Sequence, residues 1–439
     1  MRRLIYILLF FVRPATAQEM TYAYADSLTY AQYRAHDFAG LKQTVHEALG
    51  QGIDFFYLRM RAGILAYEKH RYEYAIPHFE KAQAMNPADT LITEYLYYSY
   101  VFAGRITQAL EYAAVAPEAF REKVKYAEKK METVSVTAGA LLTDNIAANE
   151  NSVILNPEDM YSQSLFSGNM LYGSVLAQGR TTNRLRLYGG VSVFSTNSLG
   201  VVQTPFAVQQ ESLNNEHVQG NFALDYAFGK NKDWTLSAGL GFYRVNKSEL
   251  TLVFDSANPG PPHTEIRTQT MQSPAGVVSL ARRFRYVQPV IGIAAARLGG
   301  TRQFQAEAGL ALFPTGSSGF YVYGSAAYLK NGNNAQTVFT GKIGGRISDR
   351  LWFETTGSFG DMSNYIASNG FLVYNTFDPV KMNLGADLRI RAGKLEIIPG
   401  YRFQQRERSV LHFSSPDVSN ATQSDYYNHI LTTSFLWKF

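Results

Sequence analysis

The chain has 439 residues, no cysteine, and a formal net charge of +5 from 41 Lys and Arg residues against 36 Asp and Glu residues. Without cysteine it forms no disulfide and holds no Cys-ligated metal, and so balanced a charge is not that of a nucleic-acid-binding protein. Charged residues make up only 18% of the chain, aromatic residues 14%, and the mean hydropathy is −0.17, which excludes a polytopic helical membrane protein and favours a β-barrel.

Residues 1–17 have the pattern of an export signal peptide. Arg2 and Arg3 precede an apolar run over residues 4–12, and Ala15 and Ala17 form a small-x-small cleavage site. The run is far shorter than the ~20 residues that a transmembrane helix requires. We therefore expect these residues to be removed; an uncleaved anchor is the alternative. The absence of cysteine after the cleavage site argues against a lipoprotein.

Residues 18–131 predict a domain of helical repeats. Ala75 and Ala82 recur as Ala109 and Ala116, a spacing of 34 residues each time. Small residues let two helices approach closely, an aromatic residue fills the gap one turn later, and proline ends the second helix. The positions expected to pack the repeats are Gly63, Ala75, Phe79, Ala82, Pro87, Ala109 and Ala116.

This small–aromatic–small–Pro pattern resembles the tetratricopeptide (TPR) repeat. Two repeats match over residues 54–120, and a third around Ala39 is degenerate. The aromatic residue at the start of the first helix is missing, and Ala113 replaces the second large aromatic residue. The resemblance implies a module that binds a peptide or protein through its concave face. The alternatives are an ordinary helical hairpin domain, a rigid plug or a spacer.

From residue 132 to residue 439 the pattern changes to the alternation of β-strands. In residues 380–391, Met382, Leu384 and Leu388 alternate with polar residues such as Asp387 and Arg389. Repetition of such segments predicts a transmembrane antiparallel β-barrel of about 14 strands, with 12 or 16 as alternatives. The expected strands are 133–143, 163–180, 184–196, 215–229, 233–249, 264–283, 286–298, 301–313, 319–331, 335–347, 350–362, 380–391, 394–411 and 424–439. The whole chain is thus an α + β multidomain protein.

The connections between these strands alternate in length. Those after even-numbered strands are short, whereas the long ones, 144–162, 197–214, 250–263, 363–379 and 412–423, all follow odd-numbered strands. Outer-membrane barrels have short periplasmic turns and long external loops. We therefore expect both ends of the barrel, and the helical domain, to lie in the periplasm. A soluble antiparallel barrel is the alternative.

The last strand carries aromatic residues at alternate positions up to the C-terminus, Phe435, Trp437 and Phe439. This arrangement resembles the C-terminal signal by which the barrel-assembly machinery recognises outer-membrane proteins. Physically, it is a lipid-facing strand with an aromatic anchor at the membrane interface.

Charged residues on the polar faces of the strands are candidates for the barrel lumen: Arg186, Glu307, Lys342, Glu354, Asp387, Arg389, Arg391, Glu396 and Arg402. Because both signs occur, they do not form a simple cation or anion filter. They either line a pathway or pair with one another to fill the barrel. Pairing Ile390 with Leu395 would set Arg389 opposite Glu396, which favours the structural role.

No catalytic, cofactor-binding or metal-binding constellation stands out, so we expect no enzyme activity and no cofactor. The nearest candidate is the segment from His412 to Ser415, where a lone histidine stands two residues before a serine. No metal-ligand spacing and no glycine-rich phosphate loop is present.

A periplasmic TPR domain before an outer-membrane barrel resembles two families: the TPR-containing exopolysaccharide export porins and the surface lipoprotein assembly modulators (Slam). The resemblance is architectural. A short helical domain with about 14 strands is nearer to Slam, because the export porins have longer TPR arrays and sixteen strands. It implies an export or translocation barrel whose helical domain recruits a surface lipoprotein or an exopolysaccharide. A non-conducting structural subunit and a passive porin are the alternatives. The expected partners are outer-membrane lipid, the barrel-assembly machinery and a periplasmic client, and not nucleic acid.

Overall fold

The computed structural model describes residues 20–126, 130–144, 160–254, 261–298, 300–367, 370–374, 378–415 and 418–439. The predicted signal peptide, residues 1–17, lies outside the described residues. The chain forms two compact units, one ending at Tyr100 and the other spanning Val101–Phe439. This division falls some 30 residues before the domain boundary predicted from the sequence, so two short helices belong to the same unit as the barrel.

The helices come in pairs with a constant spacing. Their bounds are α1 Tyr22–Arg34, α2 Phe38–Gly50, α3 Phe56–Glu68, α4 Tyr72–Met85, α5 Thr90–Phe102, α6 Ile106–Ala114 and α7 Glu118–Lys123. The first helices of the pairs begin at residues 22, 56 and 90, and the second at 38, 72 and 106. Both sets therefore repeat every 34 residues, while the assignment to the TPR family stays a prediction.

The contact between α3 and α4 explains the residue types in this repeat. A Cβ atom on Gly63 would lie only 2.4 Å from the ring of Phe79, so no larger residue fits where the two helices meet. Ala75, Phe79 and Ala82 are fully buried on α4. Pro87 follows two residues after the end of α4, where its ring cannot disturb the helical hydrogen bonds.

The next repeat departs from the predicted pattern at its end. Ala109 is buried in α6, but Ala116 lies beyond Ala114, where α6 ends, and is only partly buried. The prediction that Ala116 packs at a helix crossing is therefore wrong, because α6 has nine residues and α4 has fourteen.

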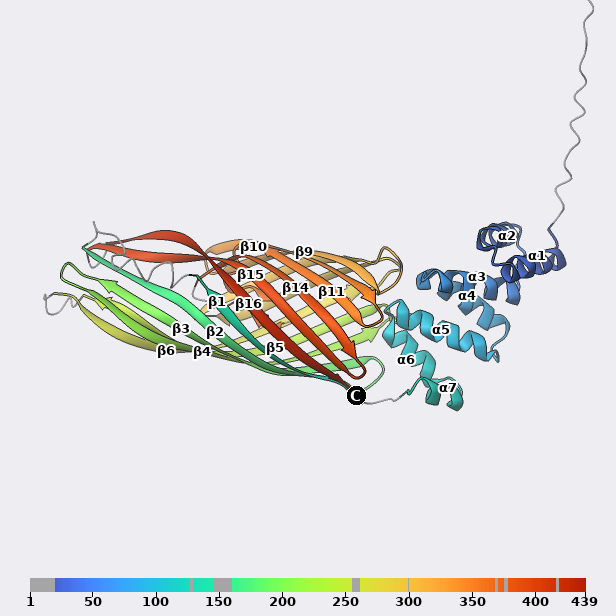
Figure 1. Cartoon of the computed structure of the whole chain (residues 1–439), viewed down its shortest axis with the longest axis horizontal. Helices are drawn as coiled ribbons and strands as arrows, with labels where there is room; N and C mark the ends of the chain where they lie inside the picture. The colour runs from blue at the N-terminus through green and yellow to red at the C-terminus, as the bar shows by residue number, and fades with distance from the viewer. Residues whose placement is uncertain are drawn as a thin grey trace, which may run out of the picture. The chain divides into compact units, whose positions relative to one another are not determined.

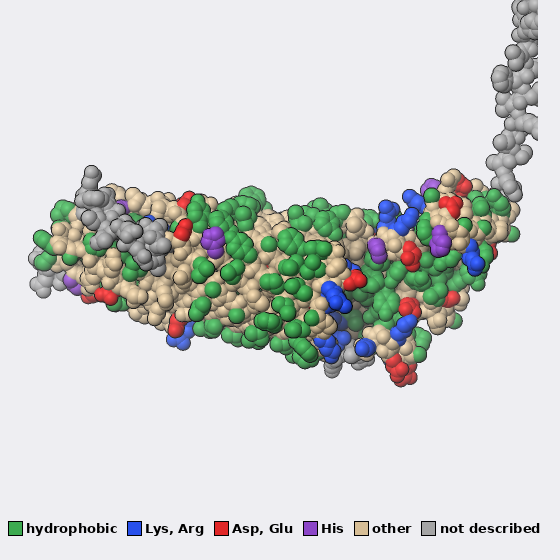
Figure 2. Space-filling model, in the orientation of Figure 1, with side chains coloured by type: hydrophobic (Ala, Val, Ile, Leu, Met, Phe, Trp, Pro, Cys, Tyr) green, Lys and Arg blue, Asp and Glu red, His purple; other side chains and the backbone are tan. Residues whose placement is uncertain are grey.

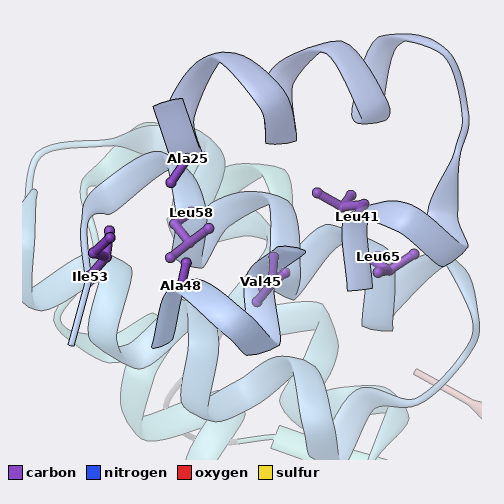
Figure 3. Packing of buried hydrophobic residues seen from close by; sticks show 8 residues of the cluster. Ala25, Leu41, Val45, Ala48, Ile53, Leu58 and Leu65 are labelled. Carbon is purple, nitrogen blue, oxygen red and sulfur yellow. The ribbon is translucent and has the colours of Figure 1, made fainter. Parts of the chain in front are cut away.

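The core of the first unit lies among α1, α2 and α3 (Figure 3). Its buried side chains come from all three helices and from the segment before α3: Ala25, Leu41, Val45, Ala48, Ile53, Leu58, Ala62 and Leu65. Since each helix contributes only an apolar stripe, the hairpins depend on one another for burial.

The second unit is a closed antiparallel barrel, and the predicted number of 14 strands is confirmed. Its strands are β1 Lys130–Thr143, β2 Tyr161–Arg180, β3 Leu185–Gln203, β4 Val208–Phe228, β5 Trp234–Val253, β6 His263–Arg282, β7 Val287–Leu298, β8 Thr301–Leu312, β9 Phe320–Asn331, β10 Asn334–Ser348, β11 Leu351–Phe359, β14 Val380–Ala392, β15 Leu395–Ser415 and β16 Val418–Lys438. Each strand pairs with its sequence neighbour in the wall, and β1 pairs with β16 to close the barrel.

The barrel has two different ends, as Figure 1 shows. At the short-turn end, brief turns join β2 to β3, β4 to β5, β6 to β7, β8 to β9, β10 to β11 and β14 to β15. The start of β1 and the end of β16 lie at the same end. At the opposite end, here called the hairpin end, β2–β6, β15 and β16 continue beyond the ends of β9–β11.

Two of the predicted long loops are instead extended hairpins. Residues 197–214 were expected to be a loop, but β3 and β4 pair continuously from Leu185↔Tyr226 to Gln203↔Val208. Similarly, β15 and β16 pair as far as Ser415↔Val418, inside the loop predicted over 412–423. The loop predicted over 144–162 lies largely outside the described residues.

The extended strands form an outer sheet with its own core. After Arg406 in the sequence, β15 no longer pairs with β14. It pairs with β2 instead, from Val410↔Ser164 to Phe413↔Tyr161. Buried inside this sheet are Val202, Leu213, Leu250 and Leu252, with Tyr161, Leu165, Phe254 and Phe413 packed against them.

The outer face of the barrel wall is apolar (Figure 2). Large apolar side chains point away from the barrel and are 40–69% exposed on eight strands: Val136, Leu171, Val191, Leu240, Ile291, Phe339, Phe353 and Leu431. A contiguous exposed apolar surface of this extent indicates contact with lipid. None of the helices in the described part of the chain is both long and apolar enough to cross a membrane.

The C-terminal aromatic residues share this outer face. Phe435, Trp437 and Phe439 are 50%, 47% and 60% exposed, and β16 carries them to the short-turn end, where the Phe439 amide donates to the Glu132 carbonyl. Their role as an assembly signal stays a prediction.

Candidate functional site

The inside of the barrel is polar, and several of the sequence-predicted lumen residues line a common cavity. Glu307, Lys342, Glu354 and Arg402 lie on the wall of a space of about 550 Å³. Glu307 accepts a hydrogen bond from the Tyr323 hydroxyl at 3.2 Å. The arrangement sets both signs of charge around one water-accessible space, as a polar pathway or a binding cavity requires.

Other predicted lumen residues are engaged in ion pairs. Asp387 on β14 pairs with Arg402 on β15 through two contacts of 2.6 and 3.0 Å. Arg186 donates from Nε to Glu132 at 3.0 Å near the short-turn end. The first pair joins the neighbouring strands β14 and β15, and the second joins β3 to β1 across β2. Both pairs stabilise the barrel as well as filling it.

Glu396 is the centre of a cluster of cations. Its carboxylate is fully buried and pairs with Arg389 at 3.6 Å, Arg391 at 3.1 Å and Lys438 at 2.5 Å. The predicted pairing of Ile390 with Leu395 is wrong, because Leu395 pairs with Ala392, so that Arg391 and not Arg389 stands directly opposite Glu396.

The physical reason for this shift is the turn. Gly393 has φ of +66°, a left-handed conformation that favours glycine. A two-residue turn of Gly393 and Lys394 therefore joins the pair Ala392↔Leu395. Arg389 still reaches Glu396, but diagonally.

The most informative feature of the lumen was not predicted as such. The described residues of 361–378, most of which belong to the external loop expected over 363–379, fold into the barrel, and we call them the inward segment. Within it, β12 (Ile366–Ala367) pairs with β13 (Leu372–Val373) as a small hairpin. Residues 368–369 and 375–377 lie outside the described residues.

Side-chain amides of the wall hold the backbone of the inward segment. Gln305 donates to the Ile366 carbonyl at 2.9 Å and accepts from the Ile366 amide at 3.1 Å. Gln303 donates to the Asn364 carbonyl and Gln336 to the Ser363 carbonyl, both at 2.6 Å. These bonds satisfy backbone groups that would otherwise be buried without partners.

The opposite wall holds the tip of the segment. The Tyr243 hydroxyl donates to the Gly370 carbonyl, and Gln219 donates to the Phe371 carbonyl at 3.4 Å. Tyr243 is fully buried. The segment is therefore attached to β4 and β5 as well as to β8 and β10, and it extends across the lumen.

Apolar contacts reinforce these hydrogen bonds. On one side, Met362, Tyr365 and Tyr374 pack with inward-facing wall residues, among them Leu329 and Val338. On the other, Ile366 and Val373 pack with Tyr243, Ala275, Ala294 and Leu298. Apolar side chains on the inside of a polar barrel are therefore explained by the segment that covers them.

The segment leaves the wall at Gly360. This residue has φ of +118°, and a Cβ atom there would lie 2.3 Å from the Thr337 carbonyl oxygen. Only glycine combines that conformation with so close an approach of two backbones. At the other end, the buried Asp378 carboxylate accepts hydroxyl hydrogen bonds from Ser167 at 3.0 Å and Tyr426 at 2.7 Å.

The inward segment also forms one wall of the large cavity. Tyr365, Ile366, Leu372 and Tyr374 line the 550 Å³ space together with the charged wall residues. The cavity therefore has an apolar side, supplied by the segment, and a charged side, supplied by the barrel. Such a mixed lining suits an amphipathic ligand or a polymer with polar and apolar faces.

No arrangement of side chains typical of a catalytic site stands out in the part of the chain that the structure describes. His412 lies on β15 and contacts the Thr422 hydroxyl on β16 at 2.6 Å, a diagonal contact between neighbouring strands. No cluster of three or more metal-ligating side chains occurs among the described residues. The absence of enzyme activity stays a prediction.

No protein-family model and no curated protein matches the chain. Among solved structures, it is similar to the Pseudomonas putida toluene transporter TodX, with 9% identity and a TM-score of 0.43 over 74% of this chain and 93% of that chain. A Pseudomonas aeruginosa FadL homologue gives 11% identity and a TM-score of 0.45 over 78% and 94% of the two chains. It is also similar to a bacterial polysaccharide outer membrane secretin, with 10% identity and a TM-score of 0.33 over 70% of this chain and 98% of that chain. The resemblance to Slam and to TPR-containing export porins stays a prediction.

Proposed function

We propose that the protein is an outer-membrane barrel that transports a client, and that the inward segment closes its lumen at rest. The apolar outer face supports the membrane position, and the polar interior with its charged cavity supports transport. The aromatic C-terminus and the short turns support an orientation with the short-turn end in the periplasm.

The observation that carries this proposal is how the inward segment is held. At its root the Met362 amide donates to the Val380 carbonyl of β14. Its remaining contacts with the wall are side-chain hydrogen bonds and local packing, and its small hairpin forms a sheet apart from the wall. Each such bond contributes only about 0.5–1.5 kcal/mol net. A client that offers replacement contacts can therefore displace the segment without disturbing the strand pairing of the barrel.

A passive porin is the least favoured function, because a segment buried across the lumen blocks free diffusion.

In planar bilayers we expect the full chain to conduct little. A variant in which residues 362–374 are replaced by a short Gly-Ser linker should show stable, larger conductance steps. A matched control replaces residues 204–207, the turn at the tip of the β3–β4 hairpin, and should conduct like the wild type.

A cross-link tests whether the segment must move. The natural chain has no cysteine, so the pair Gln305→Cys and Ile366→Cys can be joined selectively by a short bismaleimide. Cross-linking should abolish client transport in cells, and each single variant should transport after the same treatment. Full transport by the cross-linked protein would contradict gating by this segment.

A structural subunit without transport is the second candidate, and the apolar packing around the inward segment favours it. If the linker variant also fails to conduct while migrating as a folded, heat-modifiable band, the barrel is filled by more than this segment. The structural function would then account better for the lumen.

For client recruitment we propose a surface on the helical unit. Arg61 lies with its guanidinium carbon 5.4 Å from the ring centre of Tyr30 and 5.5 Å from that of Tyr57, and both rings are more than half exposed. Tyr30 lies on α1 and Tyr57 on α3, so two repeats contribute to one aromatic surface. Exposed tyrosines held in place by an arginine are frequent in protein-binding surfaces.

Two substitutions test recruitment. The double change Tyr30→Ala and Tyr57→Ala should reduce the client at the cell surface, measured as protease-accessible surface lipoprotein and as surface exopolysaccharide. Tyr24→Ala, on the same helix as Tyr30, is the control. If a strain lacking residues 20–100 displays both clients at wild-type levels, the recruitment hypothesis is wrong and the helical unit has another role.

A further inference from the structure

A second cavity, of about 410 Å³, lies at the short-turn end within the 101–439 unit. The first residues of α6 bound it on one side, and the ends of β2–β7 bound it on the other. Lys and Arg side chains gather at this end of the barrel in Figure 2. Six cationic residues line the cavity against the two carboxylates of Asp225 and Asp233: Arg105, Arg180, Arg184, Arg186, Lys232 and Arg283.

Among the described residues, four carboxylates lie in or next to this cavity. Asp233 pairs with Arg282 at 2.9 Å, and Asp225 accepts hydroxyl hydrogen bonds from Tyr188 and Ser237, both at 2.6 Å. Two further carboxylates serve the lining cations: Glu132 contacts Arg180 and Arg186, and Glu111 contacts Arg184 and Lys232. In the part of the chain that the structure describes, these four carboxylates are fewer than the six cations that line the cavity.

Arg180 adds an observation that is independent of net charge. Its side chain is only 5% exposed, and one of its terminal nitrogens, Nη2, donates to Glu132. The other, Nη1, is buried and finds no hydrogen-bond acceptor among the described residues. A buried guanidinium donor without an acceptor is destabilising. Arg180 also lines the cavity, so rotation of its guanidinium toward an anion there would give this nitrogen an acceptor.

The N-terminus of α6 provides further donors. Arg105 is the N-cap residue and makes no side-chain capping bond, and the first helical bond runs from the Ala109 amide to the Arg105 carbonyl. Ile106, Thr107 and Gln108 line the cavity at this turn. Amides in the first turn of a helix are without helical acceptors and carry partial positive charge, which favours an anion in front of them.

Glu396 shows that a group of cations at this end of the barrel can hold a carboxylate. At the same end of the barrel, three cations surround this fully buried carboxylate. There the chain itself supplies the anion. The α6 cavity offers a similar group of cations together with helix amides and the Arg180 donor, in a space large enough for an external ligand.

We propose that the α6 cavity is a binding site for an oxyanion, the phosphate or carboxylate group of a soluble ligand or client, at the short-turn end of the barrel. The site goes beyond the transport function, because binding at equilibrium requires neither conduction nor the helical unit.

The test measures binding to the full-length protein in detergent by isothermal titration calorimetry. The probes are inorganic phosphate and glucuronate, with glucose as the neutral control. We expect binding of at least one anion and none of glucose. Binding of phosphate alone assigns a phosphate site, and binding of both assigns a general oxyanion site. If neither anion binds, the proposal is overturned.

A substitution at the helix N-terminus locates the site. Gln108→Glu puts a carboxylate at the third position of α6, where a negative charge stabilises the helix, so the variant should fold at least as well as wild type. The new carboxylate competes for the same donors, and anion affinity should fall about tenfold or more, equivalent to about 1.4 kcal/mol.

Two further variants complete the test. Arg180→Gln should weaken anion binding similarly, with folding checked by heat-modifiable migration. The control Gln423→Glu, exposed on β16 at the hairpin end, should bind like wild type. If Gln108→Glu binds anions as tightly as wild type, the anions bind elsewhere and the assignment to the α6 cavity is wrong.

Discussion

The two halves of the barrel wall differ in strand length, and the longer strands build a second structure beyond the wall. β2–β6, β15 and β16 have 19–21 residues, whereas β7–β11 have 9–15. About 9–11 tilted residues cross a bilayer. The short half is therefore close to membrane thickness, and the long half continues beyond it.

The two halves also differ in what their hairpin ends build. The long half builds a paired outer sheet with its own apolar core. The short half ends early, and from its rim the inward segment enters the lumen, held by amide side chains of β8 and β10. The two halves should therefore respond differently to substitution, most strongly in the core of the outer sheet.

Leu250→Ala removes a buried side chain from the outer-sheet core and should cost about 2–5 kcal/mol locally. The β3–β4 and β5–β6 hairpins should become sensitive to added protease, while heat-modifiable migration of the barrel persists. Leu240→Ala, on the same strand but 66% exposed on the outer face, is the control. Loss of the folded band in Leu250→Ala would show that the outer sheet and the barrel fold as one unit.

Gly200→Val overpacks the same core. A Cβ atom at Gly200 would lie 2.7 Å from the Leu250 Cβ atom and 3.1 Å from a methyl group of Leu213. We expect a cost of about 1–3 kcal/mol, seen as faster hydrogen exchange in residues 198–215. Gly220→Val on β4 is the matched control, because nothing lies within 4 Å of a Cβ atom there. Equal exchange in the two variants would contradict tight packing at Gly200.

Gln305→Leu acts on the short half. It removes both hydrogen bonds to Ile366 and leaves buried backbone groups without partners, at about 1–3 kcal/mol. The inward segment should leave the lumen more often, so a cysteine introduced at Ala367 should react faster with an impermeant maleimide. Gln423→Leu serves as the control. An unchanged labelling rate would mean that packing alone fixes the segment.

The smallest effect concerns the contact of α6 with the turns of the long half. The Arg184 guanidinium, 2.5 Å from Glu111, holds the pKa of that carboxyl below its ordinary value. A lowered pKa means that this contribution to stability is present above the unfolded-state pKa and is lost as the pH falls through the folded-state pKa. Glu111→Gln should therefore melt at a lower temperature than the wild type at neutral pH. In strong acid the two melting temperatures should be equal. A difference that grows on acidification would contradict the ion pair.

Much of the wall was predictable from the sequence. The alternation in segments such as 380–391 identifies strands because lipid selects apolar residues on one face only. The same rule places Phe435, Trp437 and Phe439 on the outer face. It also gives the even strand number, since short turns alternate with longer connections.

The outer sheet and the inward segment were not predictable by that rule. Beyond the bilayer both faces of a strand can be covered, and Val201 and Val202 are adjacent yet both buried, so the alternation disappears. Nearby Asn197, Asn214 and Asn215 then favour a loop prediction. The inward path of residues 361–378 depends on Gln303, Gln305 and Gln336. These glutamines lie 25 or more residues before the segment, and no spacing in a single sequence relates them to it.

The path of β15 has a consequence for the order of assembly. The hairpin of β15 and β16 closes the wall by pairing with β1 and closes the outer sheet by pairing with β2. Both closures therefore depend on the last 45 residues of the chain, Leu395–Phe439. A chain released before its final hairpin is made would leave open edges at β1, β2 and β14 together. The outer sheet cannot mature ahead of the wall, and a single late event completes the part in lipid and the part outside it.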